Sequence, residues 1–118
     1  MTYVDGFVMP IPKKNVASYK RMARLGCKAW MENGALQYFE CLGDELKALP
    51  GMQGFPKMTK LKPSETVIFA FIIYKSRAHR DKVNAAVMNE MSKKKMPKTM
   101  PFAMNRVAMG GFKTIVSS

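Results

Sequence analysis

The chain has 118 residues, 47% of them hydrophobic, and its 20 basic and eight acidic side chains give a formal net charge of +12 at pH 7. This length suits one domain around a single core, so we expect residues 1–118 to form one domain. No apolar run approaches the roughly 18 residues of a membrane-spanning helix. The first residues carry Asp5 where a signal peptide would carry lysines. We therefore expect a cytoplasmic protein with no membrane partner.

The composition also limits the chemistry. Two cysteines, Cys27 and Cys41, without a C-x-x-C motif and with a single histidine argue against a disulfide framework or a structural zinc site. We expect no metal and no cofactor. The positive charge raises affinity for polyanions without specifying a fold. The 12 methionines suit adaptable core or interface packing, or the lining of a ligand cavity.

The first expected elements are a strand and a helix. Residues 3–9 alternate weakly and end at Pro10-Ile11-Pro12, which predicts a strand. Asn15 can cap a helix that ends near Asn33-Gly34. One face of this helix carries apolar residues at helical spacing: Val16, Tyr19, Ala23, Cys27 and Trp30.

The flank of the same helix is strongly basic. Lys20, Arg24 and Lys28 follow one another at i, i+4, and Arg21 lies beside them. Like charges at this spacing weaken a helix slightly. The row is either a solvated face or a surface that faces a polyanion.

Residues 35–43 alternate and predict a second strand. Residues 44–65 are irregular, and a loop of this length is long for a compact domain. This segment therefore either forms a flap or contains a short extra strand near residues 57–61. Residues 66–74 follow as an uncharged run rich in β-branched and aromatic side chains. This run predicts a strand in the interior of the sheet, buried on both faces.

Ser76 can cap a second helix over residues 77–91, with Val83, Val87 and Met91 on its inner side. A basic connector, residues 92–98, leads to a last strand over about 105–116. Gly110-Gly111 inside that strand indicates a bulge or a close approach of backbone, for example at a subunit contact.

The element order, β-α-β-β-α-β, predicts an α+β ferredoxin-like fold with an antiparallel sheet and two helices on one face. From right-handed crossovers we expect strands one and three to lie centrally and parallel to each other. Strands two and four would then form the edges.

Arg80 is the first candidate for a functional side chain. It falls on the apolar arc of the second helix, with Asn84 one turn later, and an arginine that faces a core needs a partner. Asp5, Glu40 and Asp44 are the available carboxylates. Arg80 therefore forms either a structural ion pair or part of a ligand cavity.

Other candidates have simpler interpretations. Asp5 and Arg106 could meet as a cross-strand pair that stabilises the sheet. His79, in the first turn of the second helix, is either a surface or capping residue or a general base. Cys41 is a buried strand cysteine or a nucleophile without a base nearby in sequence. The sequence shows no Ser-His-Asp set, glycine-rich phosphate loop or metal-ligand cluster, and whether the protein is an enzyme stays open.

A nucleic-acid interpretation rests on Phe69-Ala70-Phe71-Ile72-Ile73-Tyr74. This segment fits the last six positions of the RNA-stacking motif of RNA-recognition domains, which share the β-α-β-β-α-β topology. Val67 and Ile68 stand where the motif has a basic residue and glycine. The match is therefore partial.

The chain resembles the YbaA-like family of small bacterial proteins of unknown function over about residues 2–114. The resemblance rests on these segments: Tyr3-Val4-Asp5-Gly6-Phe7-Val8, Gly34-Ala35-Leu36, Glu40-Cys41, Arg80-Asp81, Met100-Pro101-Phe102, Arg106 and Gly110-Gly111-Phe112. The chain departs from the family pattern at Ala103, where an aspartate is usual, and at Val107.

The family is similar in fold to the dimeric α+β barrels, in which two ferredoxin-like subunits pack sheet against sheet. The resemblance implies a homodimer and no assigned reaction. By analogy with the enzymes of that fold we expect a small-molecule cavity between sheet and helices, with Tyr38 and Phe71 as apolar wall. Its candidate residues are Asp5, Trp30, Glu40, Arg80, Asn84, Phe102 and Arg106.

Three functions therefore remain. The first is a homodimer with a small-molecule ligand, the second a nucleic-acid-binding module, and the third a structural or protein-interaction dimer. A cavity protein should hold a polar cluster around Arg80, whereas a nucleic-acid binder should expose Phe69 and Phe71 beside lysines.

Overall fold

The computed structural model describes residues 1–95 and 99–118, so residues 96–98 of the basic connector lie outside the described part. The protein is α+β, with a four-stranded antiparallel sheet. Its elements in chain order are β1 (Tyr3–Pro12), η1 (Lys13–Asn15), α1 (Val16–Glu32), β2 (Gln37–Leu42), α2 (Phe55–Thr59), β3 (Glu65–Tyr74), α3 (Arg77–Met91), η2 (Met104–Arg106) and β4 (Ala108–Lys113). Within the described residues, no helix combines the length and apolar character needed to cross a membrane.

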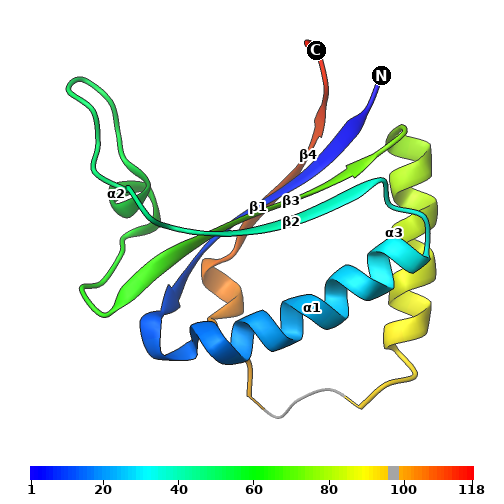
Figure 1. The fold of residues 1–118 in the computed structure, drawn as a ribbon, viewed down its shortest axis with the longest axis horizontal. Coiled ribbons are helices and arrows are strands. Elements are labelled where there is room, and N and C mark those ends of the chain that lie inside the picture. Colours follow the sequence, from blue (N-terminus) through cyan, green and yellow to red (C-terminus); the bar gives the residue numbers. More distant parts are fainter. Residues whose placement is uncertain (96–98) are drawn as a thin grey trace.

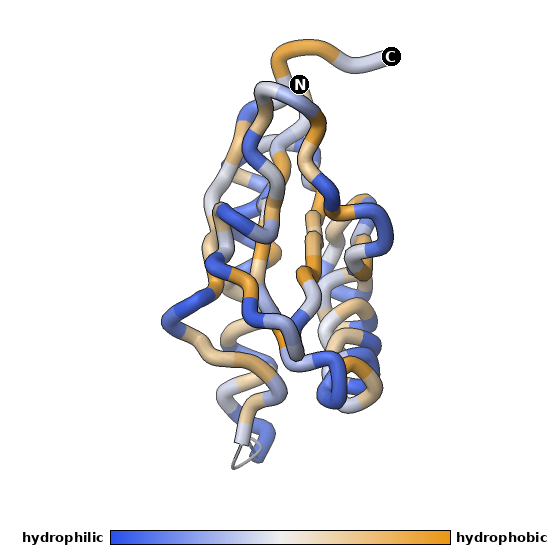
Figure 2. Tube along the Cα trace, turned by 90° about the vertical axis from the view of Figure 1, so that its left-hand side faces the viewer, coloured by the Kyte–Doolittle hydropathy of each residue, from blue (hydrophilic) through white to orange (hydrophobic). Residues whose placement is uncertain are grey.

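The two long helices lie on one side of the sheet. Figure 1 shows α1 and α3 below the strands, while both chain ends and the segment that follows β2 rise on the other side. The molecule measures 40 × 39 × 20 Å along its principal axes. Figure 2 shows hydrophobic segments running through the strands in the middle of this thin body. The sheet therefore has one face covered by helices and one face without them, which we call the helix face and the open face.

The strand order is β2-β3-β1-β4, so the expectation of β1 and β3 in the centre is confirmed. Their expected parallel orientation is wrong, because β1 pairs antiparallel with β3 in a register that joins Tyr3 to Tyr74 and Pro12 to Glu65. β2 is also antiparallel to β3. β1 and β2, which α1 connects, therefore run parallel with β3 between them. β3 and β4 likewise run parallel with β1 between them.

The burial of β3 differs from the expectation. Ile68, Ala70 and Ile72 point to the helix face and are buried, but Phe69 on the open face keeps 44% of its surface exposed. Phe71, beyond it, is half-buried. Val67, also on the open face, is buried, so the prediction of burial on both faces is wrong for the middle of β3, which neither α1 nor α3 covers on that side.

Helix and strand ends follow local signals in part. The Ser76 side chain accepts a hydrogen bond from the backbone N–H of His79, which confirms the predicted cap of α3. Gly34, with φ of 111°, follows the end of α1 in a conformation that favours glycine. Asn15 does not cap α1 as expected. Its Nδ2 instead donates to the Pro101 carbonyl at 3.0 Å and ties α1 to the segment before β4.

Residues 43–64, which we call the arm, contain the short helix α2, where a flap or a short extra strand near residues 57–61 was expected. Pro56 sits in the first turn of α2, where its missing N–H costs no hydrogen bond. Lys60 ends α2 in the left-handed conformation, with φ of 53°. In Figure 1 the arm projects beyond the sheet on the open-face side.

β1 contains two prolines although it lies inside the sheet. β4 pairs with β1 only from Tyr3 to Val8, whereas β3 pairs with it to Pro12. Pro10 and Pro12 therefore lie where β1 has passed the end of β4. A proline without an N–H is tolerated there, because that edge of β1 has no ladder to complete with β4.

The glycine pair in β4 marks a close approach and not a bulge, because the pairing with β1 is continuous. A Cβ on Gly111 would collide with the ring and hydroxyl of Tyr3 on the helix face. A Cβ on Gly110 would meet only Phe112, at 3.5 Å, on the open face. The last strand is also shorter than predicted, so Arg106 lies in η2 and not in β4.

Candidate functional site

The helix face of the sheet carries a buried ion pair between β1 and α3. Asp5, only 1% exposed, accepts a hydrogen bond of 2.6 Å from Arg80 Nη1. The Arg80 guanidinium lies 4.9 Å from the centre of the Tyr3 ring, and its Nε donates to Asp81 at 2.8 Å. Burial alone would lower the pKa of Arg80, but the hydrogen bond to Asp81 and the charge of Asp5 raise it. Arg80 thus forms the ion pair that sequence reasoning offered as one of its two roles.

Asn84 extends this pair into a network. Its Oδ1 accepts hydrogen bonds from Trp30 Nε1 at 3.0 Å and from the Tyr74 hydroxyl at 3.1 Å, and its Nδ2 donates to Asp5 at 3.4 Å. Burial, followed by the charge of Asp5, raises the pKa of Tyr74 above its usual range. The phenol therefore stays a neutral donor. β1, β3, α1 and α3 each contribute one or more members of this network.

A second carboxylate lies on β2. Glu40 accepts short hydrogen bonds from the hydroxyls of Tyr19, at 2.6 Å, and Tyr38, at 2.7 Å. Burial and then the hydrogen bond to Glu40 raise the pKa of both tyrosines well above their usual range. Both phenols are therefore donors and not bases at physiological pH. Each Glu40 oxygen uses one lone pair on a tyrosine, which leaves acceptor capacity for a further donor.

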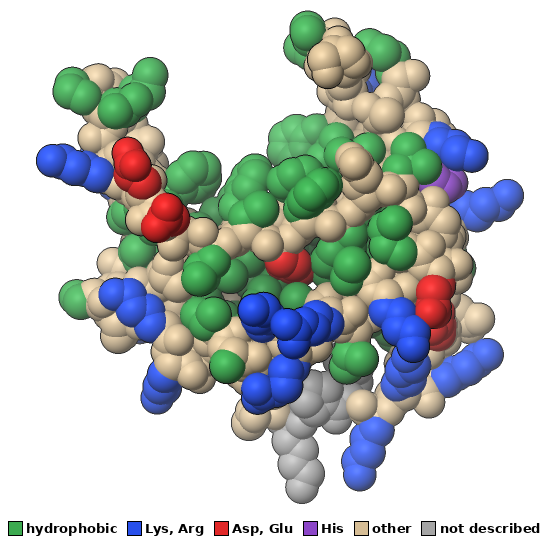
Figure 3. Space-filling view, in the orientation of Figure 1, with side chains coloured by type: hydrophobic (Ala, Val, Ile, Leu, Met, Phe, Trp, Pro, Cys, Tyr) green, Lys and Arg blue, Asp and Glu red, His purple; other side chains and the backbone are tan. Residues whose placement is uncertain are grey.

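Trp30 joins the two carboxylate clusters. Its indole donates to Asn84, and its ring lies 6.2 Å from the Tyr38 ring, whose hydroxyl reaches Glu40. Gly26, one turn before Trp30, leaves room for this ring pair, because a Cβ there would lie 3.1 Å from the Tyr38 hydroxyl. Figure 3 shows an acidic side chain in a hollow between hydrophobic side chains of the sheet and basic side chains over α1. β2 faces α1 at this side of the molecule.

The other two predicted cavity residues lie apart from the ion pair. Phe102 packs edge-on against Tyr19 at 5.7 Å, next to the Glu40 cluster. Arg106 donates to Glu65 at 2.6 Å and to the Thr59 and Lys60 carbonyls at the root of the arm. The expected Asp5–Arg106 pair is therefore wrong, since each residue has another partner. The hydrogen bond from Arg106 lowers the pKa of Glu65.

Sequence reasoning missed the tyrosine partners of Glu40. Tyr38 and Glu40 are two residues apart on a strand and so share a face, which is a signal that was present. Tyr19 was assigned only to the apolar stripe of α1. A tyrosine in such a stripe can place its hydroxyl on an opposing strand residue, and here it does.

His79 and the cysteines show no arrangement for catalysis or metal binding. His79 Nδ1 accepts from the Lys75 N–H at 2.9 Å, so the histidine closes the turn before α3. In the described part of the chain, no group of three histidine, cysteine or acidic residues is positioned to hold a metal ion. Cys41, expected to be buried, is exposed on the open face.

The open face is apolar on all four strands. Strand register places on it the residues Val4, Gly6 and Val8 of β1, Val67, Phe69, Phe71 and Ile73 of β3, Gln37, Phe39 and Cys41 of β2, and Ala108, Gly110 and Phe112 of β4. None of these side chains is charged. Phe39 stacks on Phe71 at 4.8 Å, and Phe69 lies 5.7 Å from Phe71.

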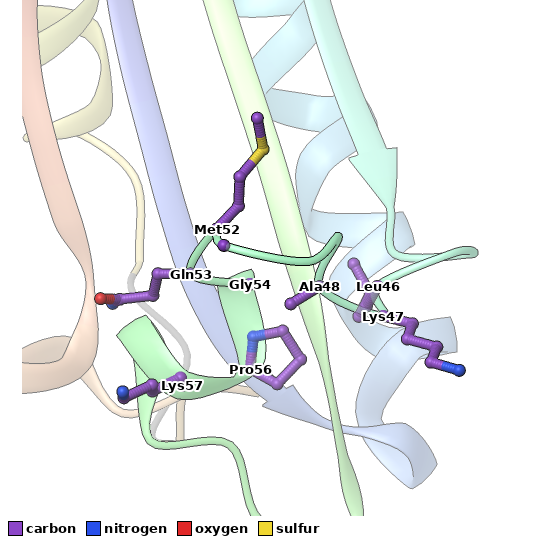
Figure 4. A pocket seen from close by; sticks show the side chains of 9 residues that line it. Leu46, Lys47, Ala48, Met52, Gln53, Gly54, Pro56 and Lys57 are labelled. Atoms are coloured by element: carbon purple, nitrogen blue, oxygen red, sulfur yellow. The ribbon is translucent and has the colours of Figure 1, made fainter.

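Two hollows border the arm. One, of about 580 Å³, lies within the arm itself. In Figure 4 the side chains of Lys47, Gln53 and Lys57 around it point outward and not toward a common centre. A binding pocket for a small molecule normally has convergent polar groups, so the arm hollow lacks that feature. The other, of about 340 Å³, opens on the sheet and includes Cys41, Phe55 and Phe69 among its lining residues.

Residues 2–104 match the family model described as "Protein of unknown function (DUF1428)". The chain is 33% identical over 116 residues to the uncharacterized protein YbaA of Escherichia coli K12, with 98% of both chains covered. The YbaA proteins of Escherichia coli O157:H7 and Shigella flexneri match equally. A solved structure, the de novo designed protein Foldit4, aligns with 97% of this chain and 99% of its own at a TM-score of 0.46 and 8% identity.

Proposed function

We propose that this chain, which belongs to the DUF1428 family of proteins of unknown function, acts in the cytoplasm as a homodimer that binds a small molecule. In this proposal two ferredoxin-like subunits pack through their open faces as a dimeric α+β barrel. The ligand lies between sheet and helices beside Glu40. No reaction is assigned. The observation that carries the proposal is the uncharged open face.

The chain has a net charge of +12, yet its open face carries no charged side chain. We infer that another molecule covers this face. The aromatic side chains Phe39, Phe69 and Phe112 are exposed by 42%, 44% and 59%. Contiguous apolar surface of this kind marks an interaction site in soluble proteins. A second copy of the same face suits it, because two strongly cationic chains can approach only where neither presents charge.

The open face supplies a large part of the area that a dimer interface buries. Strands about 4.8 Å apart, with β1 and β3 about 33 Å long and β2 and β4 about 20 Å long, give a face of roughly 500 Å² before side-chain relief is counted. A standard interface buries about 800 Å² on each partner. Phe55 of the arm packs beside Phe69 at a ring distance of 6.3 Å and enlarges the apolar surface toward that value.

The face also carries a protrusion and a hollow. Phe112 stands at the β4 edge above Gly6, while the hollow of about 340 Å³ lies at the β2 edge next to the arm. In the proposed dimer, a two-fold axis that lies between the two sheets and runs parallel to the strands brings the β4 edge of one copy opposite the β2 edge of the other. This makes the face self-complementary, as an isologous interface requires.

For the ligand, the Glu40 cluster offers the better chemistry of the two carboxylate sites. Asp5 is closed in by Arg80 and Asn84, whereas Glu40 is only partly buried and keeps acceptor capacity. Trp30 and Tyr38 supply flat apolar wall beside it. A small hydroxylated or cationic molecule is the class that this arrangement would hold.

Binding of RNA by base stacking is the second candidate, favoured by the Phe39–Phe71 stack on an exposed sheet face. Stacking surfaces of this type work together with cations that track the phosphates. The open face carries no cation on any of its four strands. We therefore place the homodimer first, and a structural dimer without a ligand remains the outcome if no molecule binds.

The test of the dimer is molar mass by light scattering at low and high salt. The wild type should show twice 13.3 kDa, which is 26.6 kDa, at both salts, because the interface is apolar. Phe39→Lys should give a monomer. Met88→Lys is the matched control, since Met88 is a comparably exposed residue on α3, away from the sheet, and it should remain a dimer. A wild-type monomer would overturn the assembly and leave the aromatic face free for RNA.

The test of the ligand site uses the single tryptophan of the chain, Trp30, as reporter. Small hydroxylated and cationic molecules are screened by Trp30 fluorescence and by the shift in Tm. A molecule that binds as proposed should lose its effect in Glu40→Gln and keep it in Glu32→Gln, an acid at the end of α1. Hits that respond equally to both substitutions would rule out Glu40 as the binding group.

A further inference from the structure

The outer side of α1 carries four cations, Lys20, Arg21, Arg24 and Lys28, which we call the basic row. All four side chains are exposed, and among the described residues none of them forms an ion pair. Figure 3 shows basic side chains gathered over α1. The row lies on the helical side of the molecule and not on the open face.

Five of the eight acids are engaged away from the row; of the other three, Glu32 lies one turn after Lys28 on α1, and Asp44 and Glu45 lie in the arm. Asp5, Asp81 and Glu65 pair with arginines of α3 and η2. Glu40 accepts from two tyrosines, and Glu90 pairs with Lys94 within α3 and its end. A surface with this imbalance attracts polyanions over a distance of about a Debye length.

The geometry of the row suits a linear polyanion. Residues four apart on a helix are separated by about 6 Å along its axis, so Lys20, Arg24 and Lys28 form a straight line about 12 Å long. Arg21 widens the line on one side. Arginine and lysine side chains that follow a helix contact successive phosphates without reading bases.

The same helix is poorly suited to a membrane surface. An amphipathic helix binds lipid by inserting its apolar face. In α1 that face is used within the fold, where Tyr19, Gly26 and Ala29 are buried against the sheet. Leu25 and Met31 are the large apolar side chains that α1 exposes, so the row can offer an anionic surface its charge but no continuous apolar face.

We propose that the basic row binds the phosphate backbone of nucleic acid without sequence preference. This inference is independent of the proposed homodimer, because the row and the open face lie on opposite sides of the sheet. In a dimer the two rows lie on opposite outer surfaces. Each row then engages a separate stretch of nucleic acid.

The experiment measures the affinity of the full chain for a labelled oligothymidine of about 20 nucleotides by fluorescence anisotropy. Four phosphate contacts predict a slope of log K against log salt of about −2.8 for a single strand. The test variant is Lys20→Gln/Arg21→Gln/Arg24→Gln/Lys28→Gln. The matched control, Lys47→Gln/Lys57→Gln/Lys60→Gln/Lys62→Gln, removes the same charge from exposed lysines of the arm.

The test variant should lose at least about tenfold in affinity at low salt, and most of the salt slope, while the control keeps most of both. Glutamine is a good helix former, so both proteins should fold, and circular dichroism with light scattering checks this. Equal losses in both variants would show that only net charge matters and would overturn the proposal. So would an unchanged affinity, or binding to anionic phosphatidylserine vesicles but not to the oligonucleotide.

Discussion

The two faces of the sheet solve the problem of burial in opposite ways. On the helix face, two carboxylates, an arginine, an asparagine and four aromatic side chains satisfy one another, and no buried side-chain polar atom of the described residues lacks a hydrogen-bond partner. On the open face there is nothing to satisfy, because its side chains are almost all apolar. The first face is complete within one chain. The second leaves aromatic rings of the single chain exposed to water.

This contrast separates what a substitution should affect. Changes on the helix face remove partners from buried polar groups and so reduce the free energy of unfolding. Changes at well-exposed positions of the open face, such as Phe112, remove contacts with the proposed second copy. They should alter association and leave the stability of the single chain almost unchanged.

The largest effect is expected at Asp5. Asp5→Ala leaves Arg80 Nη1 and the Asn84 amide without their acceptor, while Arg80 Nε keeps Asp81, and should lower the free energy of unfolding by about 3 kcal/mol. Urea denaturation followed by circular dichroism measures this loss. The double variant Asp5→Leu/Arg80→Leu should recover a large part of it, because no charge is then left unpaired. If Asp5→Ala were as stable as the wild type, the Asp5–Arg80 pair would not be a buried ion pair.

A smaller loss is expected at Tyr38. Tyr38→Phe removes one of the two donors to Glu40, and a hydrogen bond to a charged group contributes about 1.5–3 kcal/mol.

The pKa of Tyr38 is raised in the folded chain by burial and by Glu40, from an ordinary value of 10.0. A raised pKa contributes stability that is present below pH 10.0 and is lost as the pH rises above it. The difference between wild type and variant should therefore shrink in alkaline urea titrations. A difference that stays constant above pH 10.0 would contradict the assigned role of the phenol.

Substitutions at the glycine pair of β4 test the effect on stability of each sheet face at neighbouring positions. Gly111→Ala places a methyl group against Tyr3 on the helix face, and overpacking of this kind costs about 1–3 kcal/mol. Gly110→Ala on the open face meets only ordinary contact with Phe112 and should change stability by less than about 0.5 kcal/mol. The Tm values of the two variants test the ranking. Equal losses would show that the faces do not differ at this position.

The smallest expected effect is on thiol reactivity. Cys41 lies exposed on the open face, and Cys27 is half-buried on α1. In the proposed dimer Cys41 should react with a maleimide more slowly as protein concentration rises, while Cys27 should react at a constant rate. Cys27→Ser and Cys41→Ser allow each rate to be followed alone. A Cys41 rate that is independent of concentration in a dimeric sample would remove the open face as the interface.

Local signals predicted much of the fold. Ser76 and the apolar arc behind it fix α3 at residues 77–91, and the alternation before Pro10 locates β1. The orientation of β3 was not predictable from its own residues, because direction is set by which strand it pairs with. The apolar run of β3 was equally ambiguous, since a face buried by a helix and a face buried by a second chain have the same composition.

The candidate site was predicted in part. Helical phase identified Arg80 and Asn84 as inward-facing, and the contact with Asp5 follows from it. Arg106 was misplaced because the predicted last strand starts before the observed one and so includes this residue. Its partner Glu65 is 41 residues away in sequence, and no local pattern links the two. α2 was missed because Pro56 was interpreted as a loop residue. Proline in a first helical turn instead favours a helix. With only five residues, α2 is also too short to show a helical periodicity in the sequence.

The two prolines at the end of β1 act against aggregation through an exposed strand edge. Beyond Val8 the strand has no β4 neighbour, and an unprotected strand edge templates the addition of foreign strands and the growth of fibrils. Pro10 and Pro12 cannot donate the hydrogen bonds that such a strand would need. The end of β1 therefore resists the addition of a foreign strand although it lies beside a large apolar face.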